Sequence, residues 1–387
     1  MGAGPILALV IEFYLPPSAS ETEVAQTAEQ AYRPLLHLLE DHRERAALTF
    51  AVDPALARRL VAARQSGILH GLASLVEGGS AEFAAGTRSH ALLPRIPRAE
   101  VVRQIQLGDE LMRELFGDAW SPQGLFPPAL AYGRQVAETA AARRLRWLVL
   151  DEISLGRIGA APTRAVHVAN LDRELAFFFR SRDLSAAFLC ATPRALARQL
   201  DAALDGGYGV AVVPAEKLRP QTQAMKNLEW LFGEGGPVPA TLTSLLALFP
   251  ERVPVEPLPA SRRTTPEDLA MGIPFAAWSA PDNDVQGLLW HLAALAWTEA
   301  ARLCEERPDA PETRRLRAVL DAGLHSAPFR QASHGPAFRP EAVLEAGRTL
   351  YEAVEGAGAL VPESVRRQAR EAHRRLVGAV DSRTPFR

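Results

Sequence analysis

Carboxylate side chains stand at the ends of three apolar runs in the sequence. Glu12 follows LALVI, Asp151 follows WLVL, and Glu216 follows VAVVPA. Such runs are typical of buried parallel strands. Two carboxyl groups brought together where strands end could act as a general acid and a base or nucleophile. We therefore take Glu12, Asp151 and Glu216 as candidate catalytic residues, and we regard Glu12 and Glu216 as the strongest pair.

The elements that would position these residues alternate between short apolar runs and amphipathic helical stretches. This order predicts an α/β fold, because a parallel strand needs a crossover of a dozen or more residues to return to its sheet. Two further short runs, 165–169 and 174–179, predict a hairpin or an insertion. The expected strands of the parallel set span residues 5–14, 47–52, 82–86, 147–150 and 208–213.

The last third of the chain has a different pattern. Residues 250–266, PERVPVEPLPASRRTTP, are rich in proline, which neither continues a helix nor donates to a sheet. From Val285 to the C-terminus the periodicity is helical, as in LLWHLAALAWTEAARL and PESVRRQAREAHRRL. We therefore predict one domain over residues 1–260 and a helical-bundle domain over residues 261–387.

Composition excludes several classes of function. Forty-three basic and 45 acidic side chains give a net charge of −2, with no long block of either sign, so neither nucleic acid nor a membrane surface is an expected partner. Cys190 and Cys304 lie far apart without metal-ligand spacing, so no disulfide, metal or cofactor is predicted. The apolar run 6–14 is too short to span a bilayer, and we expect a cytoplasmic protein of undefined oligomeric state.

Several motifs occur in an order that resembles a known family. SHALLP is followed by a helix carrying QIQLGDELMRELFG, then GLFPPALAY, then a strand ending in LDE. LALVIEFYLPP, FAVDPALARRL, RDLSAAF, VAVVPAEK with LEWLF, WSAPDNDVQGLLWHL and HSAPFRQASHGPAF extend the likeness over most of the chain. This order of motifs is similar to that of glycoside hydrolase family 57, whose members hydrolyse, transfer or branch α-glucans.

The resemblance implies a (β/α)7-type parallel barrel followed by an all-α domain that packs on the barrel mouth. By analogy with eight-stranded barrels, the site would lie at the C-terminal ends of the strands. The resemblance also implies a retaining mechanism, in which a carboxylate nucleophile and a carboxylic acid lie about 5–5.5 Å apart.

The sequence departs from the family pattern at the positions that carry this chemistry. The resemblance places Ala129 of GLFPPALAY where the family has its nucleophilic glutamate, and Pro214 of VAVVPAEK where it has its general acid. The opening His-x-His-Gln-Pro motif is represented by residues 12–16, EFYLP, so both histidines are missing. A methyl group cannot be a nucleophile, and these losses predict a protein without the usual catalytic groups.

Four other residues are candidates for binding a sugar. The resemblance aligns His90 with a family histidine that could donate to a sugar hydroxyl, although a structural histidine in a loop would fit equally well. Tyr132 could form a stacking wall or simply pack in the interior. Trp278, beside Asp282 in WSAPDN, is the best candidate for ligand stacking, whereas the seven-residue spacing of Trp290 and Trp297 indicates helix packing.

Three hypotheses about function follow from these observations. The first is a family 57-like barrel without catalytic activity that serves as a carbohydrate-binding, regulatory or scaffold protein with a glycan ligand. The second is an active, divergent glycosidase or glucanotransferase that uses displaced carboxylates such as Glu216, Asp151 and Glu12. The third, a metal-dependent polysaccharide deacetylase, would need a cluster of Asp and His ligands that the sequence does not show.

Overall fold

The computed structural model describes residues 5–159, 161, 164–204, 206–233 and 236–383. The chain divides into two compact units. The first, which we call the barrel unit, comprises residues 1–88 and 93–262, and the second, the helical unit, comprises residues 89–92 and 263–387. Whether residues 1–260 and 261–387 are independent domains stays a prediction.

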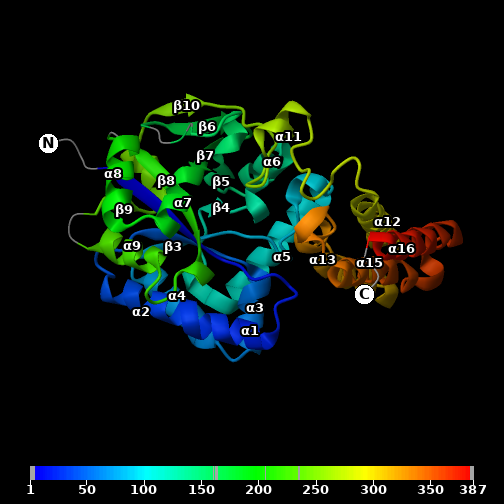
Figure 1. Cartoon of the computed structure of the whole chain (residues 1–387). Helices are drawn as coiled ribbons and strands as arrows, with labels where there is room; N and C mark the ends of the chain where they lie inside the picture. Colours follow the sequence, from blue (N-terminus) through cyan, green and yellow to red (C-terminus); the bar gives the residue numbers. More distant parts are fainter. Residues whose placement is uncertain (1–4, 160, 162–163, 205, 234–235, 384–387) are drawn as a thin grey trace. The chain divides into compact units, whose positions relative to one another are not determined.

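Seven parallel strands of the described residues close into a barrel (Figure 1). They pair in the order β1-β2-β3 and β4-β5-β7-β8-β1. The ring closes between β3 and β4, where the amide of Ala85 donates to Gly124 and the carbonyl of Ala85 accepts from Phe126. The (β/α)7-type barrel is therefore confirmed. Its strands are β1 (Ile6–Phe13), β2 (Leu48–Val52), β3 (Ala81–Ala84), β4 (Gly124–Leu125), β5 (Trp147–Asp151), β7 (Glu174–Arg180) and β8 (Tyr208–Pro214).

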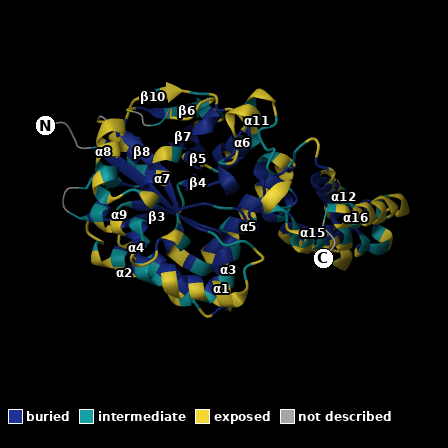
Figure 2. Cartoon of the chain, in the orientation of Figure 1, coloured by how far each residue is buried: buried dark blue, intermediate teal, exposed yellow. Residues whose placement is uncertain are grey.

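Helices connect and cover the barrel strands. Figure 2 shows dark, buried strands inside a shell of helices whose outer turns are exposed. Local signals set many of these helices: Ser20 caps the first with Glu23 in a capping box, and Asp53 caps the third, with Pro54 at the first helical position. The helices of the barrel unit are α1 (Glu21–Thr27), α2 (Arg33–Asp41), α3 (Pro54–Ala62), α4 (Ser66–Glu77), α5 (Arg98–Phe116), α6 (Arg134–Ala142), α7 (Arg182–Cys190), α8 (Pro193–Leu204), α9 (Gln223–Phe232) and α10 (Leu242–Leu248).

Three parts of the sheet differ from the sequence-based expectations. The strand β4 was not expected, because two residues within a proline- and glycine-rich segment carry no periodicity. The run that predicted a hairpin does pair antiparallel, β6 (Val166–Asn170) with β7, but β7 also completes the barrel through β5. The proline-rich stretch includes a short strand, β10 (Arg252–Pro254), beside β6, while β9 (Val238–Ala240) pairs with β1.

The helical unit confirms the predicted run of helices beyond residue 285. Trp290 stacks on Phe329 with ring centroids 4.1 Å apart and lies 6.5 Å from Trp297, so these aromatic side chains pack within the unit. The unit contains α11 (Pro266–Ala270), α12 (Asp284–Glu306), α13 (Pro311–Gly323), α14 (Ser326–Gln331), α15 (Pro340–Glu355) and α16 (Glu363–Arg383).

Closure of the barrel at β4 depends on a glycine. A β-carbon on Gly124 would lie 1.9 Å from Cδ2 of Trp147, whose ring is fully buried and whose Nε1 donates to Thr243 at 2.9 Å. We expect Gly124→Ala to lower the free energy of unfolding by about 3 kcal/mol, because neither the ring nor the strand has room to move. Urea unfolding measures this change.

A matched control for Gly124→Ala exists in α4. A β-carbon on Gly67 would meet no atom within 4 Å, so Gly67→Ala should leave stability unchanged or raise it by up to about 1 kcal/mol through helix propensity. Equal effects of the two substitutions would mean that the Gly124 contact does not constrain the barrel.

Candidate functional site

The alternation of side chains along the barrel strands decides which residues face the barrel interior at its C-terminal mouth. In β1, Ile6, Ala8 and Val10 belong to the inner apolar cluster, whereas the residues between them pack outward against the helices. Because the side-chain period of a strand is two, Glu12 continues the inner face. In β5, Trp147 and Val149 belong to the same inner cluster, so Asp151, two residues further on, also lies on the inner face.

The two neighbouring strands follow the same rule. In β7, Ala176 and Phe178 line the interior, and the next inner position is Arg180. In β8, Val210 and Val212 lead to Pro214, which lies in register with Glu12 of β1. The interior therefore changes from apolar to charged at the mouth, where Glu12, Asp151 and Arg180 succeed aliphatic and aromatic side chains.

Asp151 is an anchor for two arginines. Its side chain is fully buried and accepts from Arg180 Nη1 at 2.9 Å and from Arg182 Nε at 2.7 Å. It also accepts from the amide of Ile153 as the cap of the following 3-10 turn. A carboxylate held by two guanidinium groups is compensated for its burial, but it is not free to attack a substrate.

Glu152 is the neighbour of Asp151 and also holds a loop in place. Its carboxylate accepts from the amides of Gly159 at 3.0 Å and Arg182 at 2.8 Å. Burial raises the pKa of Glu152, although these two amides oppose the shift. Asp151 therefore caps a turn, and Glu152 anchors the loop that follows.

Glu12 forms an ion pair with Arg262, the last residue of the barrel unit in the sequence. Arg262 Nη1 lies 2.5 Å from Oε2 of Glu12, and the amide of Arg262 donates to the carbonyl of Ala129 at 2.9 Å. Oε1 of Glu12 is buried and has no hydrogen-bond partner among the described residues. A buried carboxylate oxygen without a donor is costly, so this atom is suited to accept from a water or a ligand hydroxyl.

Glu216 lies near Glu12, in the turn that follows β8. Its side chain is half-buried, and burial raises its pKa, with a further contribution from the negative charge of Glu12. Lys217 and Arg262 oppose this shift. The charge of Glu12 therefore acts on the Glu216 carboxyl. A catalytic role for this pair stays a prediction.

Asp53 adds a further acid at the end of β2. Its Oδ1 accepts from the amide of Leu56 at 2.8 Å as the cap of α3. Burial raises the pKa of Asp53 to about 7; the helix amides oppose this shift, and the charge of Glu12 increases it. Asp53 is thus protonated in part of the population near neutral pH.

Ala129 follows β4, where the resemblance places a nucleophile. It is buried, and both it and Leu130 adopt left-handed backbone angles, with φ of 56° and 52°. This conformation is uncommon for residues with a β-carbon and is held here by the bond from Arg262 to the Ala129 carbonyl. At this position the side chain contributes a methyl group and no titratable atom.

Tyr132 packs into the barrel unit rather than presenting its ring. Only 4% of the residue is exposed, and its ring meets Phe177 edge-on with centroids 5.8 Å apart. Tyr132 also lines a hollow of about 530 Å³ with Arg134 and with residues 168–171. Burial raises the pKa of the Tyr132 hydroxyl to about 12. A binding role for it stays a prediction.

His90 groups with the helical unit, together with the other residues of segment 89–92. Its Nδ1 lies 3.1 Å from Oγ of Ser326, and its ring stacks on that of His325 with centroids 5.4 Å apart. The backbone of His90 has a φ of 53° and accepts from the amide of Ser326. These contacts hold segment 89–92 within the helical unit, and a sugar-binding role for His90 stays a prediction.

Trp278 and Asp282 also belong to the helical unit and lie in different environments. Trp278 is buried and accepts from Trp290 Nε1 through its carbonyl, while its own Nε1 is buried without a hydrogen-bond partner among the described residues. Asp282 is exposed in the turn before Asn283 caps α12. Contact of Trp278 or Asp282 with a sugar ligand stays a prediction.

Sequence reasoning missed the arginines of the mouth and Asp53. Arg180 could have been found, because the alternation in ELAFFFR places it on the inner face of its strand. From the sequence alone, Asp53 directly before Pro54 indicates only a helix cap. No local signal identifies Arg262, because its partner Glu12 lies 250 positions earlier in the chain.

The described part of the chain has neither a metal-binding cluster nor a membrane-spanning helix. It contains no group of three His, Cys, Asp or Glu side chains that could hold a metal ion. No helix within the described ranges is both long and apolar enough to cross a membrane.

Comparisons with known proteins agree with the motif order. Residues 10–196 match the sequence model of glycosyl hydrolase family 57. A comparison with curated proteins gave no match. A GH57-type branching enzyme from Pyrococcus horikoshii is similar in structure, with a TM-score of 0.74 at 14% identity, over 99% of this chain and 98% of that one.

Two further solved structures share the fold. An α-amylase from Thermotoga maritima has a TM-score of 0.65 at 12% identity, over 99% of this chain and 100% of that one. A 4-α-glucanotransferase from Thermococcus litoralis has a TM-score of 0.67 at 13% identity, over 90% of this chain but only 58% of that one. Residues 10–196 therefore resemble glycosyl hydrolase family 57 in sequence, and the chain as a whole shares the fold of the branching enzyme and the α-amylase.

Proposed function

We propose that this chain binds an α-glucan or a related oligosaccharide at the barrel mouth and does not hydrolyse it. The similar structures are described as a branching enzyme, an α-amylase and a 4-α-glucanotransferase, which supports an α-glucan as the ligand class. The observation that carries the loss of hydrolysis is Ala129. A retaining mechanism needs a carboxylate at this position, and a methyl group cannot form the glycosyl intermediate.

The other acids of the mouth support the same proposal. Asp151 is fully buried between two arginines, and Glu12 is held by Arg262, so both carboxylates already serve as ion-pair partners. Binding a sugar, unlike hydrolysing it, requires no free catalytic carboxylate. The unpartnered Oε1 of Glu12 can accept from a sugar hydroxyl, and the half-buried Glu216 can do the same.

One observation favours a second candidate function, a divergent glycosidase or glucanotransferase. Glu12 lies at the end of β1, and Glu216 follows the adjacent strand β8. The raised pKa of Glu216 and the ion pair of Glu12 with Arg262 give the asymmetry that an acid and a carboxylate require. In that case Glu216 would protonate the leaving oxygen and Glu12 would attack or activate water.

Calorimetric titration with maltoheptaose, together with a reducing-end assay, tests both functions. We expect saturable binding without release of reducing ends, and at least fivefold weaker binding by Glu12→Gln, which removes the carboxylate charge. Glu174→Gln is the matched control, because Glu174 begins β7 at the opposite end of the strand from Arg180. It should bind as the wild type does.

The outcomes separate the two candidates. Release of reducing ends that Glu216→Gln abolishes would refute the noncatalytic proposal and establish the second function. Absence of any binding to maltoheptaose or to glycogen would refute both, because each requires an α-glucan at the mouth.

A further inference from the structure

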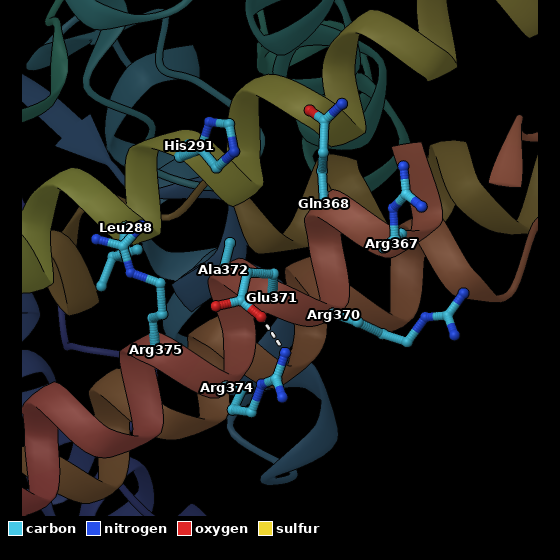
Figure 3. A pocket seen from close by; sticks show the side chains of 9 residues that line it. All are labelled: Leu288, His291, Arg367, Gln368, Arg370, Glu371, Ala372, Arg374 and Arg375. Carbon is cyan, nitrogen blue, oxygen red and sulfur yellow. Dashed lines mark hydrogen bonds and ion pairs between the residues drawn. The ribbon is translucent and has the colours of Figure 1, made fainter. Parts of the chain in front are cut away.

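We infer that a groove on the helical unit, separate from the barrel mouth and independent of the proposed function, binds a small molecule that carries a polyphosphate. The groove has a volume of about 520 Å³ and lies between α12 and α16 (Figure 3). Leu288 and His291 of α12 line it on one side, and the basic stretch of α16 lines it on the other. A volume of this size is typical of small-molecule sites.

The lining carries an excess of positive charge. Four arginines of α16 and one acid, Glu371, contribute to it. Arg370 pairs with Glu355 and Glu363, and Arg374 pairs with Glu371. Over the described residues, the remaining two, Arg367 and Arg375, have neither an ion pair nor a side-chain hydrogen bond. The groove therefore holds two guanidinium groups whose charge is uncompensated.

The spacing of these two arginines suits more than one phosphoryl group. Arg367, Glu371 and Arg375 follow one another at intervals of four residues, so they lie along one face of α16. At 1.5 Å per residue, the α-carbons of Arg367 and Arg375 are about 12 Å apart, and their long side chains can converge on linked phosphates. Guanidinium groups bind phosphate oxygens through paired N–H donors.

The rest of the groove favours a small ligand over a nucleic acid. Leu288 and Ala372 provide apolar surface for an organic group attached to the phosphates. The chain as a whole has a net charge of −2, whereas a nucleic-acid site needs a basic surface that follows several phosphates along a strand. The charge in this groove is local and matches a short polyanion.

Calorimetric titration of the full chain with inorganic pyrophosphate tests the inference. We expect saturable binding that weakens roughly tenfold or more in the double variant Arg367→Gln/Arg375→Gln. Glu371→Gln should bind more tightly than the wild type, because it removes the one acid of the groove and frees Arg374. Arg314→Gln is the matched control, because Arg314 is exposed on α13 of the same unit and outside the groove.

Three outcomes would overturn the inference. They are no pyrophosphate binding by the wild type, equal binding by the double and control variants, and equal competition by sulfate at the same ionic strength. Stronger binding of a single-stranded oligonucleotide that depends on the same two arginines would assign the groove to a nucleic acid instead. Circular dichroism of each variant confirms that the helices are intact, and the gain expected for Glu371→Gln does not depend on a loss of fold.

Discussion

Replacing Asp151 by asparagine is expected to lower the free energy of unfolding by about 3–5 kcal/mol, because it breaks a buried ion-pair network. The Asp151 carboxylate is fully buried and neutralises Arg180 and Arg182, whose side chains are only 20% and 22% exposed. An asparagine can still cap the turn at Ile153, but it leaves two guanidinium groups without their counter-charge at the barrel mouth. Urea unfolding followed by tryptophan fluorescence measures the change.

Glu174→Gln is the matched control for Asp151→Asn. Glu174 lies at the start of β7 and pairs with Arg252 at 3.2 Å, but its side chain is 52% exposed. A surface pair of this kind contributes less than about 1 kcal/mol, so the control should unfold near the wild-type midpoint. Similar small losses in both variants would contradict the anchoring role of Asp151. Unchanged stability, together with a release of reducing ends by the wild type that the variant lacks, would instead make Asp151 a catalytic group.

Local sequence signals sufficed for much of the barrel unit. The largely apolar run 5–14 predicted a buried parallel strand, and the whole of β1 is buried. The sequence Ser20-Glu-Thr-Glu has the spacing of a capping box, and both of its hydrogen bonds form. These signals lie within a few residues of the features they determine, so they can be recognised from the sequence alone.

Tertiary contacts determined the elements that the sequence did not show. The strand β4 is two residues long and exists because Ala85 on one side and β5 on the other complete its hydrogen bonds. The arginine that pairs with Glu12 lies in a proline-rich segment that predicted only a domain boundary. In both cases the deciding partner is far away in the chain, and no periodicity encodes it.

In the candidate site, too, some features follow from the local sequence and others depend on distant contacts. The ends of apolar runs placed Glu12 and Asp151 at the C-terminal ends of barrel strands and Glu216 just beyond one, because that inference needs only the position of a strand. The state of each acid depends on its surroundings: Asp151 is neutralised by two arginines, whereas Glu216 keeps a raised pKa. Sequence position alone therefore could not distinguish an anchor from a candidate acid.

Asp53→Asn is expected to remove a large pH dependence of stability. Burial raises the pKa of Asp53 from its ordinary value near 3.9 to about 7 in the folded chain. The folded state therefore holds this proton more tightly than the unfolded state. The resulting stabilisation is fully present below pH 4 and is lost as the pH rises through 7. A shift of roughly three pH units corresponds to as much as about 4 kcal/mol.

Asparagine preserves the cap of α3 and cannot ionise, so the stability of the Asp53→Asn variant lacks this pH-dependent contribution. We expect Asp53→Asn to equal or fall slightly below the wild type in stability at pH 4 and to exceed it by several kcal/mol at pH 8. Urea unfolding at four or five pH values measures the difference. Asp41→Asn, at the exposed end of α2, controls for the loss of a surface carboxyl. Parallel pH profiles for the wild type and both variants would show that the Asp53 carboxyl titrates alike in the folded and unfolded chains, and that its burial beside Glu12 imposes no charge penalty.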